Sequence, residues 1–100
     1  MTGVPKGFDA VLHPPARLQI AAVLAQADQV EFARLRDITA VSDSVLSKHL
    51  SALTEAGHIK LSKAAADGRQ RTWASLTRAG RKAFAAHVAA LEALVATAAG

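Results

Sequence analysis

Apolar side chains recur at helical spacing along much of the chain, and each such run predicts a helix. Prolines at positions 14 and 15 favour a helix start, because the first turn of a helix does not use their missing amides. We therefore predict a first helix over residues 16–27, a short extended segment over residues 30–32 and a brief second helix over residues 33–39. The predicted apolar face of the first helix comprises Leu18, Ala21, Ala22 and Ala25.

A third predicted helix has the sharpest boundaries. Ser42 is a suitable N-cap, because its hydroxyl can accept a hydrogen bond from an amide of the first turn. Gly57 can adopt the left-handed conformation that commonly ends a helix. Between these two residues, Leu46, Leu50 and Leu53 recur at i, i+4 and i+7. The spacing predicts a helix that buries one leucine face.

Beyond this helix the spacing of apolar residues changes to two. Ile59 and Leu61 alternate with polar residues, as expected of a half-exposed strand. The pair Asp67-Gly68 is typical of a tight hairpin turn, and residues 72–76 then form a returning strand. We expect Trp73 to pack on the hairpin or in the core rather than to stack on nucleic-acid bases.

The last predicted helix covers residues 77–98 and starts at a cap supplied by Thr77. Between residues 83 and 99 its polar side chains are His87, Glu92 and Thr97. A helix that is apolar on nearly all sides exposes more apolar surface than a small monomer can bury. We therefore predict a homodimer formed through this helix; the alternative is an internal core helix with one poorly soluble face. The predicted interface comprises Phe84, Val88, Leu91, Leu94 and Val95.

Composition narrows the classes of function. Of the 100 residues 51% are hydrophobic, but 24 are alanine, so the core is thin and the chain fits one small domain. The absence of cysteine excludes disulfide scaffolds, zinc fingers and cysteine nucleophiles. The four histidines lack the spacing of a helical metal pair, and no glycine-rich phosphate loop or catalytic triad is present. We expect no metal, no cofactor, no enzymatic activity and no membrane partner, in a cytoplasmic protein.

Positive charge is concentrated in the middle of the chain. The net charge is +4, yet residues 44–82 hold eight basic and two acidic side chains, a net charge of +6. Residues 1–43 carry a net charge of −1. A single polyanionic partner could therefore bind the whole of this basic segment.

Two short helices, a basic hairpin and a final helix follow one another in the order of a winged helix-turn-helix. We predict a mainly α fold with a small β-hairpin: an N-terminal arm over residues 1–12 and the winged helix-turn-helix domain over residues 13–100. Helix 42–56 is expected in the major groove of DNA and the wing, residues 58–76, at the minor groove. The predicted DNA-binding residues are Ser42, Ser44, Ser47, Lys48, His49, Ser51, Lys63, Arg69 and Arg71.

Three segments carry a resemblance to a known family. They are residues 13–20 (HPPARLQI), residues 45–57 (VLSKHLSALTEAG), and residues 67–80, which begin DGR and end LTRAG. The chain resembles the small winged-helix transcriptional regulators related to the MarR and ArsR groups. The resemblance implies that Ser44, Ser47 and Lys48 lie in the major groove and that Arg69 is the wing arginine. Independently of the resemblance, the short spacing within the turn suggests that Asp67 holds Arg69 by a local ion pair. The sequence lacks the ligand clusters of the metal-sensing members and the extra helices that would wall an effector pocket.

These features predict a sequence-specific regulator that binds double-stranded DNA as a homodimer and acts as a repressor. Two recognition helices about one DNA turn apart would read a near-palindromic site. The alternative is a winged-helix module that binds another protein and not DNA. Exposed serines on a helix and a charged hairpin can also be ordinary solvated surface.

Overall fold

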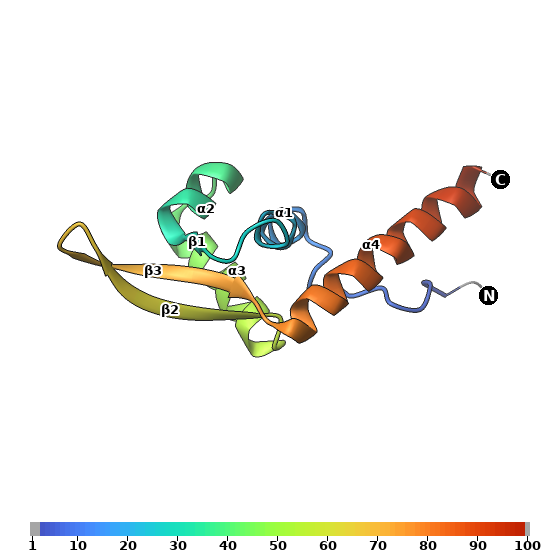
Figure 1. Ribbon diagram of the computed structural model, residues 1–100. Helices are drawn as coiled ribbons and strands as arrows, with labels where there is room; N and C mark the ends of the chain where they lie inside the picture. The colour runs from blue at the N-terminus through green and yellow to red at the C-terminus, as the bar shows by residue number, and fades with distance from the viewer. Residues whose placement is uncertain (1–2, 100) are drawn as a thin grey trace.

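Three helices pack against a small antiparallel sheet, and a fourth helix projects from it (Figure 1). The computed structural model describes residues 3–99. The three strands are arranged in the order β1-β3-β2. The predicted fold class, mainly α with a small β-hairpin, is confirmed. The elements are α1 (Pro15–Leu24), β1 (Val30–Glu31), α2 (Phe32–Thr39), α3 (Asp43–Glu55), β2 (Ile59–Ala66), β3 (Arg69–Leu76) and α4 (Arg78–Ala99).

Local chemistry sets the boundaries of α3 and α4, as the sequence predicted, whereas α1 ends at Leu24 and not at residue 27. The Ser42 hydroxyl accepts a hydrogen bond from the Val45 amide at 3.2 Å and caps α3. Gly57 follows α3 with a φ of 80°, a conformation that glycine adopts without strain. The Thr77 hydroxyl accepts from the Gly80 amide at 2.8 Å and caps α4.

The hairpin is longer than the alternating pattern predicted. Its turn is formed by Asp67 and Gly68, with φ values of 53° and 75°, which are typical of the tight turns that suit the strand twist. β3 begins directly after this turn at Arg69, because backbone pairing with β2 continues to the turn whatever the side chains are. β1 pairs with β3 on its other side and turns the hairpin into a three-stranded sheet.

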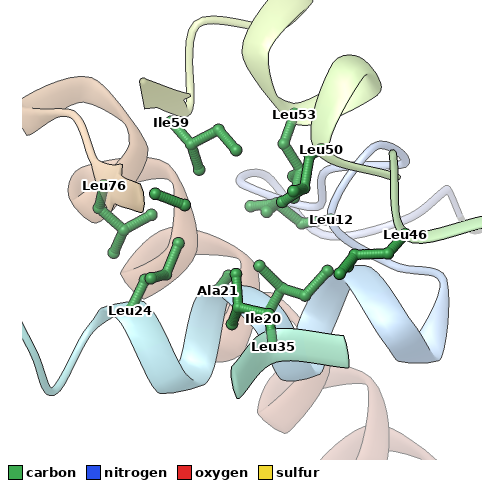
Figure 2. Packing of buried hydrophobic residues seen from close by; sticks show 11 residues of the cluster. Leu12, Ile20, Ala21, Leu24, Leu35, Leu46, Leu50, Leu53, Ile59 and Leu76 are labelled. Carbon is green, nitrogen blue, oxygen red and sulfur yellow. The ribbon is translucent and has the colours of Figure 1, made fainter. Parts of the chain in front are cut away.

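The core joins the three helices to the sheet. Leu46, Leu50 and Leu53 of α3 are buried, as their spacing predicted (Figure 2). From α1 the buried residues include Ile20 and Leu24, so the predicted apolar face of this helix was only partly right: Ala21 is buried and Ala25 packs against the core, but Leu18 and Ala22 are only half-buried. Burial of the larger aliphatic side chains removes more apolar surface from water than burial of alanine does.

The segment predicted as an N-terminal arm is packed along α4 as far as the structure describes it. Leu12 is completely buried in the core. Gly7 has a φ of 96° and lies so close to Ala86 that a Cβ there would be 2.9 Å from the Ala86 carbonyl oxygen. Residues 1 and 2 of the predicted arm lie outside the described residues.

The molecule is elongated, with principal extents of 55 × 26 × 21 Å. The hairpin extends at one end and α4 at the other (Figure 1). Gly80, in the first turn of α4, lies against the backbone of His58 at the base of the hairpin. Among residues 3–99, no helix combines the length and the apolar character needed to cross a membrane.

Candidate nucleic-acid interface

α3 presents a polar face opposite its buried leucines. Ser44, Ser47, Lys48 and Ser51 are all exposed, as the helical period predicted. Ser42, the cap, is also exposed, and its hydroxyl lies 3.3 Å from that of Ser44. Small side chains on this face allow another molecule to come close to the helix.

A groove separates α3 from the hairpin. Ser47 and Ser51 line it from α3, and Lys63 lines it from β2. Between these polar residues the groove has apolar walls, which include Leu61, a side chain that is 42% exposed. The other lining residues are Phe32, Leu50 and Thr72. The fold therefore brings three of the predicted DNA-binding residues, from two elements, to one surface.

The predicted cations of the hairpin do not all lie on the same face. Lys63 is opposite Thr72 in the β2–β3 register, and both line the groove beside α3. Side chains alternate between the two faces of a strand. The side chains of Arg69 and Arg71 therefore leave β3 on the face opposite to that of Thr72. Arg69 is exposed and directly follows the turn, which places its long side chain at the tip of the hairpin.

Arg71 is held by an acidic residue of the neighbouring strand. Its Nη1 donates to Oε2 of Glu31 at 2.6 Å, and this hydrogen bond, together with the charge of Glu31, raises the pKa of Arg71. The pair links β3 to β1 beside the turn into α2. The expected ion pair between Asp67 and Arg69 is not among the ion pairs of the described residues, so that prediction was wrong: Asp67 instead adds to the negative potential at Arg71.

His49 lies at the other flank of α3, where α1 meets it. Arg17 donates from Nε to Nδ1 of His49 at 3.1 Å. Partial burial and the adjacent Arg17 cation lower the pKa of His49. His49 is therefore neutral at pH 7, and because its Nδ1 accepts, its proton is on Nε2.

The start of α3 is joined to α2 by a contact that the sequence pattern did not reveal. Arg36 donates to Oδ1 of Asp43 at 3.0 Å. Asp43 is the acidic residue in the first turn of α3, where the helix dipole favours negative charge. The ion pair offsets that charge next to the exposed serines. The two residues lie seven positions apart in different helices, so no helical period pairs them.

The side chains predicted as a dimer interface fall into three environments on α4. Phe84 is half-buried against the domain core. Val88, Leu91 and Val95 line an open apolar hollow, whose other lining residues are Glu92 and Ala96. Leu94 lines a second hollow together with Val4 and Pro5 of the N-terminal segment.

The chain matches a known family of DNA-binding domains. A sequence model described as a winged helix DNA-binding domain matches residues 16–95. The chain belongs to this winged-helix family. An uncharacterised protein of Methanocaldococcus jannaschii is 31% identical to it over 74 residues, which cover 74% of this chain and 80% of that protein.

Solved winged-helix structures agree with the assignment. A transcriptional regulator homologue from Pyrococcus horikoshii OT3 is 25% identical, with a TM-score of 0.80, and the match covers 87% of this chain and 86% of that one. A MarR family transcriptional regulator from Silicibacter pomeroyi DSS is 26% identical, with a TM-score of 0.68, over 89% of this chain and 58% of that one. The resemblance to small winged-helix regulators is thus confirmed.

Proposed function

We propose that this protein binds double-stranded DNA at specific sequences and represses transcription as a homodimer. The observation that carries the proposal is the groove in which Ser47 and Ser51 of α3 and Lys63 of the hairpin lie together. Hydroxyl and ammonium groups bind phosphate oxygens, and the apolar wall at Leu61 suits the sugar of the same nucleotide. One strand of DNA backbone could occupy the groove while α3 enters the major groove beside it.

The exposed face of α3 would read the bases. Ser44, Ser47 and Ser51 are short enough to let the helix approach base edges and can donate or accept hydrogen bonds there. Lys48 extends from the middle of the same face and can reach a guanine edge or a phosphate. Ser42, which caps the helix, lies where the free amides of the first turn favour a phosphate.

The hairpin would act as the wing. Arg69, exposed after the turn, suits a narrow and strongly negative minor groove. Arg71, predicted from the sequence as a direct contact, is better suited to bracing the wing, because Glu31 already holds its guanidinium. The brace would hold the angle between the hairpin and α2, and with it the width of the groove beside α3.

His49 would contribute a neutral donor. Its Nδ1 is occupied by Arg17, so the group left to meet a phosphate oxygen is Nε2–H. Arg17 would act as a positioning residue for this contact. A histidine held in this way makes binding insensitive to its own titration near neutral pH.

Dimerisation would use the open side of α4. Val88, Leu91 and Val95 form an apolar surface on a helix that projects from the domain, and Val95 is 68% exposed. Two copies packed by a two-fold axis along this surface, extended at its margin by Leu94, would present two α3 helices to a near-palindromic site. Phe84, committed to the core, would only border the interface. A DNA partner accords with the cytoplasmic location expected from the sequence.

The proposal is tested by selecting bound fragments from a pool of random duplex DNA with the purified full chain. We expect an enriched motif with two inverted half-sites, separated by about one helical turn. A protein that retains no duplex at low salt, yet forms a stable complex with another protein, would overturn the proposal in favour of a protein-binding winged helix.

A further inference from the structure

Val45 is an apolar side chain on the otherwise polar face of α3. The helix contains three other large apolar residues, Leu46, Leu50 and Leu53, and all three are buried. Val45 is 39% exposed. It lies in the first turn of α3, the part of a recognition helix whose side chains contact base edges.

The position of Val45 separates it from the polar groove. Steps of 100° per residue place Val45 on the side of α3 that carries His49, four positions later, and away from Ser47. His49 itself is neutral, because partial burial and the Arg17 cation lower its pKa, and the charge on this flank is that of Arg17, which donates to Nδ1 of His49. The two flanks of α3 therefore differ: hydroxyls and Lys63 lie on the wing side, and an apolar side chain beside a neutral imidazole lies on the α1 side.

We propose that Val45 packs against the C5-methyl group of a thymine in the major groove and thereby selects thymine at one position of each half-site. The inference rests on the proposed function and adds a base preference to it. The thymine methyl is the apolar group that base edges present in the major groove, so an apolar side chain gains there what it cannot gain from a guanine, cytosine or adenine edge. A valine covers a methyl group without leaving a polar atom unpaired.

The test replaces single thymines of the selected duplex by deoxyuridine, which removes the methyl group and keeps the base pair and O4. For the wild-type protein we expect one thymine per half-site at which this change weakens binding about fourfold, the change that corresponds to one buried methyl group. Val45→Ala should bind the thymine and deoxyuridine duplexes with equal affinity at that position. Lys48→Ala, the control, should weaken binding to both duplexes and keep the fourfold ratio between them.

The outcomes separate the two proposals. Wild-type protein that binds duplex DNA tightly but tolerates deoxyuridine at every position overturns the role of Val45 and leaves the proposed function intact. The same holds if Val45→Ala retains the thymine preference. Failure of the wild-type protein to bind any duplex overturns the proposed function, and the base preference with it. Circular dichroism checks that Val45→Ala folds, as expected for a partly exposed valine replaced by a better helix former.

Discussion

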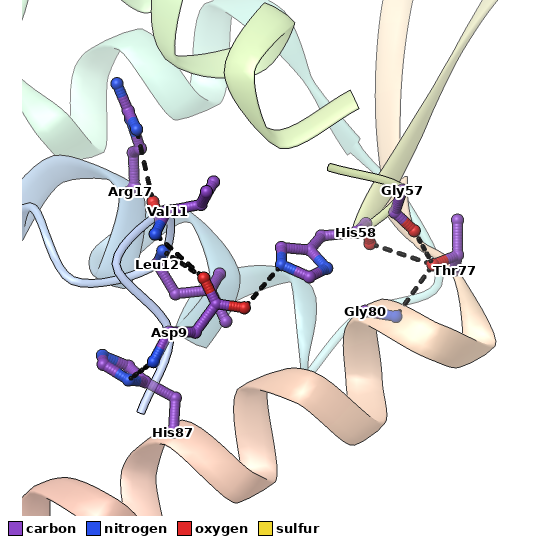
Figure 3. A network of polar contacts seen from close by, with 9 residues as sticks. All are labelled: Asp9, Val11, Leu12, Arg17, Gly57, His58, Thr77, Gly80 and His87. Carbon is purple, nitrogen blue, oxygen red and sulfur yellow. Dashed lines mark hydrogen bonds and ion pairs between the residues drawn. The ribbon is translucent and has the colours of Figure 1, made fainter. Parts of the chain in front are cut away.

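The backbone amide of Asp9 donates a hydrogen bond to Nδ1 of His87 at 2.9 Å and so joins the N-terminal segment to α4 (Figure 3). The carboxylate of Asp9 lies 2.8 Å from Nε2 of His58, at the base of the wing. One residue therefore connects α4, the hairpin base and the chain leading into α1. His87 is completely buried, and its Nε2 has no hydrogen-bond partner among the described residues.

Stability should fall when His87 is protonated. Burial, together with the nearby His13, lowers the pKa of His87 below its ordinary value of 6.5. The unfolded chain therefore takes up this proton at a higher pH than the folded protein does, and the free energy of unfolding decreases as the pH falls below about 6.5. Protonation at Nδ1 would also remove the acceptor used by the Asp9 amide. Urea unfolding at about pH 7.5 and about pH 5 measures the difference.

The matched variant for this prediction is His87→Gln, which keeps an acceptor and does not titrate. It should lose less stability between the two pH values than the wild type does. His49, whose pKa is also lowered, contributes in the same range, so His49→Gln is measured beside it. Asp9 affects stability in a different pH range. Burial alone would raise its pKa, but hydrogen bonds from His58, Val11 and Leu12 lower it. Its contribution to the free energy of unfolding is therefore lost only below about pH 4. An unchanged pH dependence in His87→Gln would contradict the prediction.

Two lysines of one strand should differ in their effect on DNA binding. Lys63 lies on the face of β2 that lines the groove, and Lys60 starts from the opposite face, three positions earlier. If a dimer neutralises about eight phosphates, the logarithm of the association constant falls against the logarithm of salt concentration with a slope of about −7. Lys63→Ala should reduce the magnitude of this slope by about 2, because each subunit loses one phosphate contact. Lys60→Ala should leave the slope unchanged. Equal slopes for the two variants would argue against DNA in the groove.

Gly80 should tolerate no side chain. A Cβ at this position would overlap the carbonyl oxygen of His58, which belongs to the backbone and cannot move aside. Gly80→Ala should therefore lower the free energy of unfolding by about 3 kcal/mol, measured by urea denaturation. Gly3→Ala is the control, because nothing lies within 4 Å of a Cβ there, and its stability should match that of the wild type. Similar stabilities of both variants would show that α4 does not seat on the hairpin base as described.

A charge on the open side of α4 should separate the dimer. Val95→Glu would place a carboxylate in the proposed interface, where it has no partner, and should weaken dimerisation on the order of a hundredfold. Ala93→Glu adds the same charge at an exposed position two residues earlier, on the far side of the helix, and should leave the dimer intact. Sedimentation equilibrium measures both. Dimers of equal strength in the two variants would move the interface away from Val88, Leu91 and Val95.

Much of the fold could be predicted because its signals are local. The Ser42 cap, the leucines of α3, the Asp67-Gly68 turn and the Thr77 cap each depend on residues within about two helical turns of one another. The exposed serines of α3 followed from the same period. The predicted apolar face of α1 relied on alanines, whereas Ile20 and Leu24, which also lie at helical spacing, are the larger side chains that the core buries.

The sequence by itself determined the order of the elements, their caps and turns, and the polar face of α3, because these depend on backbone preferences and helical period. Only the tertiary structure decided which of the predicted binding residues are available and which are held. Arg71 meets Glu31, and Arg17 meets His49, over separations of 40 and 32 residues. Such contacts depend on how strands and helices pack in three dimensions, which no local pattern of side chains encodes.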